Sequence, residues 1–591
     1  MKRASFASIL FVSLVGLVAA AISHDCPRYP SSEWSFNPVI LQKNLQGRVQ
    51  LTRIAGTLAL DDGGSPTPQN FIDDYIFGKL RDQGVPSAPM ASDAEFIRRV
   101  TIDLLGRTPA AGRIRSFLED PRPDKREVLI DELLSSSAFV DRWASWFDDL
   151  FRNTSTYPAI TVAGRNALHE YLRQSIQRGK PYDDMVAELI QASGDSNQGP
   201  PNYLLRNYVF GDPEQDFFDD VTANITATFL GIPTLCISCH SGQHHLEPIN
   251  VYLSHKTRTE FWEQSAFFSR IKVQPLSADS SNGSAKYDIS DTPNGSYTSE
   301  MSGYLGQRPP RTGGPYQPRY LFTGEAAQSE NPRSELARVL TSDFQFARNI
   351  ANRMWAHFMG VGIVDPPDGF DLESYRTQAS HPDLLDRLAQ DTVDNGFDLR
   401  HLMRRITSSS AYQLSAAYPG AWQEEYSRLF ARKLTRRLEA EEIHDSIIQA
   451  TNSGEPYYIE GASEPVRWAM QLPDTNEPHE SPAQILMDLL GRGNRTYKAR
   501  DSGSSILASL SLMNDPLVKS LTTFQGDANL ARLQSLSDDA VVEEIFLRTL
   551  SRFPTAEEKR VAVMHMTEES IAGIEDLQWA LINRPEFILN H

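Results

Sequence analysis

Apolar residues recur every three or four positions along most of the chain after about residue 70, a spacing typical of amphipathic helices. In the first such stretch, five apolar side chains fall on one helix face: Phe71, Ile72, Tyr75, Ile76 and Leu80. Similar patterns predict helices around 93–105, 112–119, 124–134, 138–151 and 164–178. A further helix with Val221, Ile225 and Phe229 is predicted to end at Gly231, because glycine commonly follows the last residue of a helix.

A change in composition divides the chain. Residues 273–330 are rich in Ser, Asn, Gly and Pro, which predicts a long, largely irregular connection with at most a few short strands. Helical signals return after it: Ser481 and Gln484 form a capping box, and Thr555 forms another with Glu558. We therefore predict a mainly α fold with two helical domains, at 70–272 and 331–591.

The N-terminus predicts export. Lys2 and Arg3 precede an unbroken stretch of apolar and small residues at 6–22, which ends in three alanines suited to signal peptidase. Residues 1–23 are predicted to be a signal peptide, and 24–69 to be an irregular N-terminal segment. Because no second hydrophobic stretch is long enough to span a bilayer, we expect a periplasmic or extracellular protein.

Composition narrows the choice of partners. The chain has 591 residues, 40% of them hydrophobic, and a formal net charge of −19, so it can build a sizeable core. A nucleic-acid partner is excluded, because phosphate backbones demand a basic surface. Two of the three cysteines form one Cys-x-x-Cys pair. This is not the pattern of a fold stabilised by several disulfides.

That pair opens the most informative motif, Cys236-Ile237-Ser238-Cys239-His240. A C-x-x-C-H sequence is the attachment sequence of c-type haem. The two thiols add to the two vinyl groups of one porphyrin, and the histidine binds the iron from one side. Cys236, Cys239 and His240 are therefore predicted to hold one covalent haem.

Two other interpretations of the motif stay open. An oxidising compartment favours a short-loop disulfide between Cys236 and Cys239. A zinc ion could instead take both sulfurs with His244 or His245, at a spacing found in structural zinc sites.

A second polar cluster lies in the C-terminal half. Asn349, Arg353 and His357 are four residues apart, so they share one helix face. Three aspartates follow in a predicted loop, at 365, 368 and 371. Such a face against an acidic loop is either an acid–base or binding site, or a hydrogen-bonded network that holds helix to loop.

Separated motifs together resemble a known pair of domains. In the first half these are FIRRV at 96–100, DLLGRTP at 103–109, PYD at 181–183 and FLG at 229–231 before the cysteine motif. In the second half they are NPRSELA at 331–337, NRMWAHFMGVG at 352–362, SHPDLL at 380–385 and NGFDL at 395–399. The first half is similar to the planctomycete cytochrome c-like family (domain of unknown function 1549), and the second to its companion, domain of unknown function 1553.

The resemblance implies an exported bacterial protein with a haem site, and it implies no established activity. The family usually has a second histidine two residues after the motif. Here Ser241, Gly242 and Gln243 come first and His244 and His245 follow, so the local turn is expected to differ.

The leading hypothesis is an exported cytochrome c-like protein with one covalent haem, active in electron transfer or redox chemistry. The alternatives are a non-redox binding or scaffold protein with a structural cysteine pair, and a metal-dependent hydrolase acting on extracellular polymers. The redox partner, the substrate and whether the protein is an enzyme stay open.

Overall fold

The computed structural model describes residues 38–57, 64–278, 285–299, 308–496, 500, 506–524, 528–569 and 571–591. The predicted signal peptide at 1–23 lies outside these residues. Within them the chain forms 27 α-helices and two small sheets, which confirms the mainly α prediction. None of the described helices is both long and apolar enough to cross a membrane.

The helices of the first half are α3 (Phe71–Asp82), α4 (Asp93–Leu105), α5 (Ala111–Glu119), α6 (Lys125–Leu134), α7 (Ser137–Leu150), α8 (Val162–Gln177), α9 (Tyr182–Gln191), α10 (Asn202–Leu205), α11 (Glu214–Ile225), α12 (Leu235–Cys239), α13 (Val251–Ser254) and α14 (Arg258–Ser265). Of these, α3–α8 begin and end close to their predicted positions, whereas α9, α10 and α12–α14 were not predicted. Local chemistry sets several of these ends. Ser92 and Glu95, for example, bond each other's backbone N–H groups in a capping box at the start of α4.

The predicted connection contains a hairpin of β2 (Ile271–Ala278) and β3 (Ala285–Asp291). A short strand, β1 (Gly194–Asp195), pairs with the other edge of β3, so that the sheet order is β1-β3-β2. Beyond the hairpin the described chain is irregular, with isolated bridges between Tyr297 and Tyr316 and between Arg319 and Ala326. Both of those tyrosine positions lie against the body of the protein, and Tyr297 is fully buried. The connection is therefore packed against the domains.

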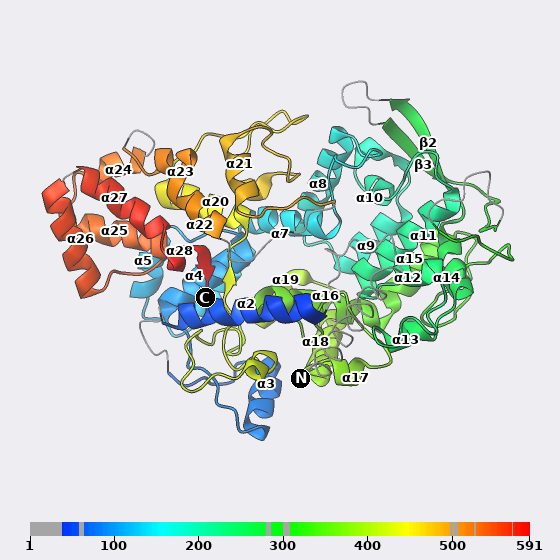
Figure 1. The fold of residues 1–591 in the computed structure, drawn as a ribbon, viewed down its shortest axis with the longest axis horizontal. Helices are drawn as coiled ribbons and strands as arrows, with labels where there is room; N and C mark the ends of the chain where they lie inside the picture. Colours follow the sequence, from blue (N-terminus) through cyan, green and yellow to red (C-terminus); the bar gives the residue numbers. More distant parts are fainter. Residues whose placement is uncertain are drawn as a thin grey trace, which may run out of the picture.

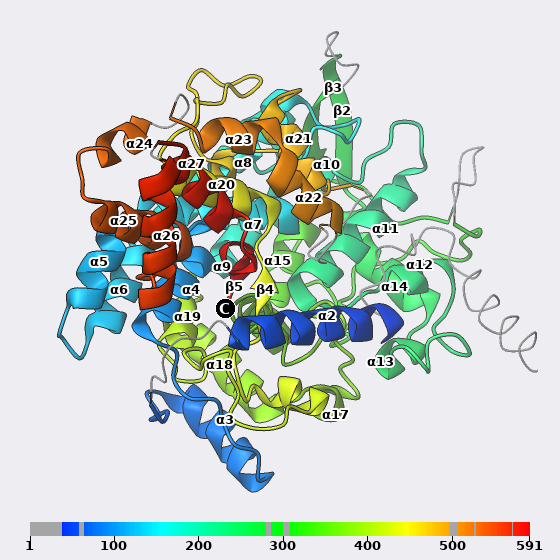
Figure 2. The same cartoon turned by 60° about the vertical axis from the view of Figure 1, so that its left-hand side comes forward.

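The second half is again helical. Its helices are α15 (Pro332–Ser342), α16 (Phe344–Met359), α17 (Tyr375–Gln378), α18 (Pro382–Asp394), α19 (Leu399–Thr407), α20 (Ala440–Thr451), α21 (Pro482–Leu489), α22 (Ile506–Asn514), α23 (Pro516–Leu521), α24 (Ala528–Leu533), α25 (Asp538–Leu550), α26 (Ala556–Glu569), α27 (Ile571–Ile582) and α28 (Pro585–Ile588). Strand β4 (Arg436–Arg437) pairs antiparallel with β5 (Leu589–Asn590). Helices α24–α28 form one end of the molecule, and α11–α14 lie at the other (Figures 1 and 2).

The expectation of an irregular segment at 24–69 is wrong for part of that range, because helix α2 occupies Pro38–Gly56. Its sequence has little apolar periodicity, so contacts distant in sequence stabilise it. The Thr435 N–H donates to the Thr52 hydroxyl at 2.8 Å, and Ala55 is buried with Ala416 and Leu589. Tertiary packing of this kind overrides weak local propensity.

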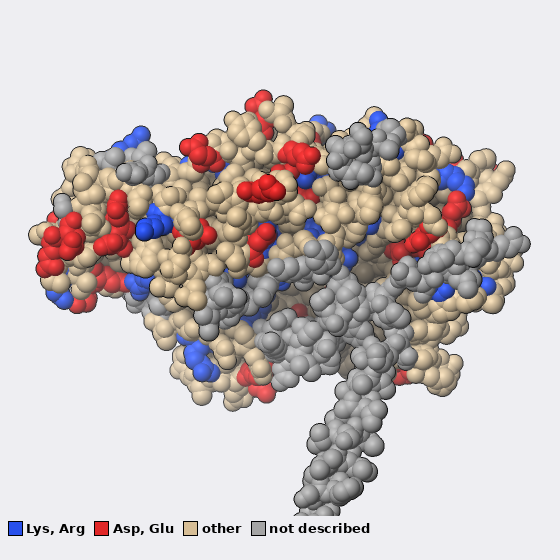
Figure 3. Space-filling model, turned by 45° about the horizontal axis from the view of Figure 1, so that its top comes forward, with Lys and Arg blue, Asp and Glu red and all other residues tan. Residues whose placement is uncertain are grey.

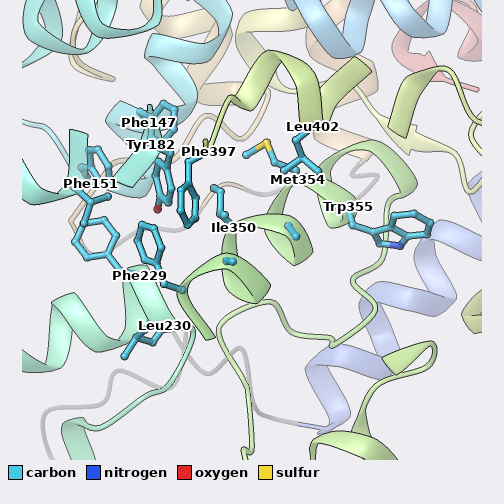
Figure 4. Close-up of a cluster of buried hydrophobic side chains, with 14 of the residues drawn as sticks. Phe147, Phe151, Tyr182, Phe229, Leu230, Ile350, Met354, Trp355, Phe397 and Leu402 are labelled. Carbon is cyan, nitrogen blue, oxygen red and sulfur yellow. The ribbon is translucent and has the colours of Figure 1, made fainter. Parts of the chain in front are cut away.

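The hydrophobic cores do not divide at the connection. The larger core contains buried residues from Ile72 to Leu434, together with Leu547 of α25, and so includes side chains from both halves. The Tyr182 ring stacks on Phe346 at a centroid distance of 5.1 Å, and Phe346 contacts Phe397 at 5.4 Å. Figure 4 shows Phe147, Tyr182 and Phe229 of the first half close to Phe397 of the second. Because each buried aromatic contributes about 1.5–3 kcal/mol, the two halves stabilise each other.

A second core lies among the C-terminal helices. It contains buried residues from Leu438 to Phe587, together with Ile102 of α4. The change from one core to the other therefore falls near residue 435, well after the predicted connection.

Candidate functional site

The cysteine motif forms helix α12, a single turn at the surface. Cys236, Cys239 and His240 are partly exposed, whereas Ile237 and Ser238 between them are buried. Positions i and i+3 share one side of a helical turn, so the two cysteines lie on the same side of α12, and His240 follows directly as its extended C-cap residue. Cys239 has a free thiol, so no disulfide joins the two cysteines in this structure.

A left-handed glycine sets the direction in which the chain enters the motif. Gly231 ends the π-helical turn Thr226–Leu230 with φ at 69°. A Cβ there would lie 2.6 Å from Asn349 Oδ1 and 2.9 Å from the Pro367 carbonyl oxygen. The Gly231 carbonyl also accepts from Phe370 N–H at 2.9 Å. The motif is therefore held against the second half of the chain directly before it begins.

Helix α16 completes this junction with side chains. Asn349 Nδ2 donates to the Thr228 carbonyl at 2.8 Å, Arg353 Nη2 to the Ala227 carbonyl at 2.9 Å, and Gln345 Nε2 to the Leu230 carbonyl at 2.8 Å. Carbonyls at a helix end have no partner within the helix, and these side chains supply one. Asn349 and Arg353 thus form a hydrogen-bonded network, but with the π-helical turn at 226–230 and not with the predicted acidic loop.

His357 lies further along the same helix and takes part in a different contact. Its Nε2 is 3.2 Å from the Asp103 carbonyl oxygen, and its ring meets Trp143 edge-on at 5.0 Å. Burial, and then the nearby Arg142, lower the pKa of His357 to about 3. An imidazole with so low a pKa stays neutral at ordinary pH and is poorly matched to acid–base catalysis.

The low pKa of His357 predicts an effect of pH on stability. Since the folded pKa lies below the unfolded value of about 6.5, the unfolded chain takes up a proton first, and stability is lost as pH falls from about 6.5 towards 3. Between pH 7 and pH 5, we expect the unfolding free energy of the His357→Gln variant to fall by about 1–2 kcal/mol less than that of the wild type. Denaturant unfolding at several pH values measures it. His255→Gln, at an exposed histidine, is the control; equal pH dependence in both variants would contradict the assignment.

The aspartates after α16 do not gather into one acidic site. Asp371 accepts from the Val251 and Tyr252 N–H groups at 2.8 and 3.0 Å, which caps α13 just after the motif. Burial raises the pKa of Asp365. Asp368 interacts electrostatically with Arg353. Asp371 thus bonds α13, the next helix after the cysteine-bearing α12.

The two histidines after the motif are exposed. The His245 and His240 rings lie 4.5 Å apart between centroids. His245 is therefore placed beside His240 at the surface, and its role as a metal ligand stays a prediction.

The ligands of the predicted alternative zinc site do not lie together among the described residues. Among the residues that the structure describes, no three His, Cys, Asp or Glu side chains lie close enough to hold a metal ion. His244 is turned by its positive φ of 72°, and its N–H donates to the Glu247 carboxylate at 2.6 Å. The His244 backbone is thus part of the turn after the motif, where the spacing of the histidines differs from the usual family pattern.

The connection supplies residues that sequence patterns did not identify. Arg308 Nε donates to the Ser238 hydroxyl at 2.9 Å, between the two cysteines, and Arg258 Nε donates to the Ser238 carbonyl at 2.9 Å. Arg308 and Arg311 are buried and pair with three aspartates of α11, at 216, 219 and 220. We call residues 308–311 the strap. The only sequence signal for the strap was the pair of arginines within four residues. It could not have revealed their aspartate partners, which lie about 90 positions earlier in the chain.

The arrangement defines a mainly helical protein with a surface Cys-x-x-Cys-His turn that both halves and the strap hold in place. Residues 71–273 match the PSCyt2 family model, and residues 332–566 match the PSD1 family model. Both are described as proteins of unknown function (DUF1549 and DUF1553). The chain thus carries a PSCyt2 domain followed by a PSD1 domain, and the predicted resemblance is confirmed. Neither a curated protein nor a solved structure matches it.

Proposed function

We propose that the chain is an exported cytochrome c-like protein that binds one haem covalently through Cys236, Cys239 and His240 and acts in electron transfer or redox chemistry. The observation that supports this most is the outward side of α12. It carries both cysteines on one turn, with His240 as the next residue and Cys239 as a free thiol. The first domain also belongs to a family with a cytochrome c-like name.

The chain's own residues fit such a group in three ways. The thiols at i and i+3 face the same direction, as attachment to one ring requires. Ser238, bonded by two arginines, and the buried Ile237 fix the inner side of the turn. His240 Nδ1 lies 2.9 Å from the Ser241 carbonyl oxygen, and such a bond orients the ring and leaves the other nitrogen to serve as ligand. The bound haem would supply the capacity to take up and release one electron.

The polar face of α16 gives the hydrolase hypothesis less support than α12 gives the haem proposal. Asn349, Arg353 and His357 each direct a nitrogen at a main-chain carbonyl of another segment. Those contacts hold the two halves together, so the face has a structural role that needs no substrate.

The test is the visible spectrum of the protein after export from a host with a c-type haem attachment system. We expect the alkaline pyridine spectrum of a c-type haem at one haem per chain. Cys236→Ser/Cys239→Ser should lose it, and His240→Ala should lose most of it. The control Cys26→Ser should keep it. A colourless wild-type protein in which the motif thiols react with a thiol reagent would contradict the proposal.

A further inference from the structure

An apolar groove lies at the end of the molecule opposite the cysteine motif. It is formed by α25, α26 and α27 and has a volume of about 620 Å³, within the range of about 300–1,000 Å³ typical of ligand sites. Its apolar lining comprises Phe546, Val561, Ala562, Leu577, Trp579 and Ala580. Figures 1 and 2 place these helices far from α12.

The groove leaves apolar surface in contact with solvent. Val561, which lines it, is 45% exposed, and Met564 one turn further along α26 is 51% exposed. Both belong to a helix that also packs into the C-terminal core through Ala562 and Met566. Exposed apolar side chains at and beside an apolar groove are features of binding sites.

The charges around the groove are acidic. Glu557, Glu558 and Asp576 line it, and no Lys or Arg is among its lining residues in the described chain. Glu558 is neutralised by Arg552 and Arg584, at 2.8 and 2.7 Å. Among the described residues, Glu557 pairs with the exposed Arg560, and Asp576 lies 3.2 Å from the His565 ring. Both carboxylates line the groove, where a cationic partner would meet them.

The surrounding surface has the same sign. Helices α26 and α27 together carry six carboxylates and two cationic side chains, Lys559 and Arg560. Figure 3 shows acidic side chains gathered at this end of the molecule. An apolar groove with an acidic rim is complementary to an amphipathic helix with basic flanks.

We propose that this groove, which we call the α26–α27 groove, binds a cationic amphipathic helix of a partner protein. Helix α26 has 14 residues, so the groove runs beside a helix about 21 Å long. A partner helix of three to four turns would place one row of apolar side chains against Phe546 and Trp579. Its Lys or Arg residues would then meet Glu557 and Asp576. This inference does not depend on haem.

The probe is a fluorescent amidated peptide of about 14 residues, with Leu at i, i+3, i+4 and i+7 and Lys elsewhere, titrated into the full exported chain. We expect saturable binding that weakens as salt rises. A matched peptide with Glu in place of Lys should bind about tenfold more weakly or worse. Equal binding of the two peptides would overturn the proposal.

Variants locate the binding. Ala580→Trp fills the groove at an exposed position and should weaken the Lys peptide about tenfold. Glu557→Gln/Asp576→Asn should weaken it severalfold, whereas Glu568→Gln/Glu569→Gln, which removes the same charge outside the lining, should leave it within about twofold. Unchanged affinity in Ala580→Trp, or equal losses in the two double variants, would contradict the assignment. So would a concentration-dependent dimer that Ala580→Trp abolishes, because the occupant would then be a second copy.

Discussion

Replacing Arg311 with Met is expected to cost about 3–5 kcal/mol of unfolding free energy. Arg311 Nη2 lies 2.7 Å from Asp216 Oδ1 and 2.6 Å from Asp219 Oδ2, and all three side chains are buried. Removing the guanidinium leaves two buried carboxylates short of a partner, and the penalty for such charges exceeds the value of the pair itself. The midpoint of urea unfolding, followed by tryptophan fluorescence, measures this cost.

Arg319→Met is the matched control. It lies in the same connection, but its side chain is 51% exposed and 3.6 Å from Glu263, so its loss should cost less than about 1 kcal/mol. Equal destabilisation by the two variants would show that the strap has no special role. A large loss for Arg311→Met alone would show that the connection is part of the folded unit around the motif.

Gly242→Ala is expected to disrupt the turn that follows the cysteine motif. A Cβ at this position would lie 1.9 Å from the Leu253 carbonyl oxygen and 2.8 Å from Ser254 Cα. These are backbone atoms, and the Gly242 N–H itself donates to the Lys256 carbonyl at 2.8 Å, so the segment cannot relax without losing its bonds. Overpacking of this severity costs about 3 kcal/mol or more.

For Gly242→Ala we expect a lowered unfolding midpoint and, in a haem-attaching host, a smaller fraction of haem-loaded chains. Gly112→Ala is the control, since nothing lies within 4 Å of a Cβ there. It sits in exposed α5, where alanine should raise stability by about 0.5–1 kcal/mol. If Gly242→Ala matched Gly112→Ala in stability and haem content, the close approach at Gly242 would carry no constraint.

Local signals in the sequence predicted the helices well. Helices α4–α8 begin and end within two residues of the predicted ranges, because capping residues and apolar periodicity act over a few neighbouring positions. Helix α2 was missed for the opposite reason. Its stability comes from residues near 416, 435 and 589, which no local window contains.

The same limit applies to the site. Spacing alone predicted Cys236, Cys239 and His240 as the haem site, and the structure places the two cysteines on α12 with His240 directly after it. Spacing also placed Asn349, Arg353 and His357 on one face, but their partners at 227, 228 and 103 could not be derived from it. Arg308 was missed altogether, because its contact with Ser238 bridges 70 positions. The candidate site residues can be predicted from local spacing in this chain, whereas the packing that supports them depends on contacts between distant segments.

The central claim, that the motif holds a haem covalently, is tested most directly by the intact mass of the denatured chain after export with a haem-attachment system. Denaturation removes any group held only by packing or coordination, so added mass reports a covalent bond alone. We predict the mature chain plus one haem for the wild type, and the bare mature chain for Cys236→Ser/Cys239→Ser. A wild-type mass without haem, in a host that loads another c-type cytochrome, would contradict the claim.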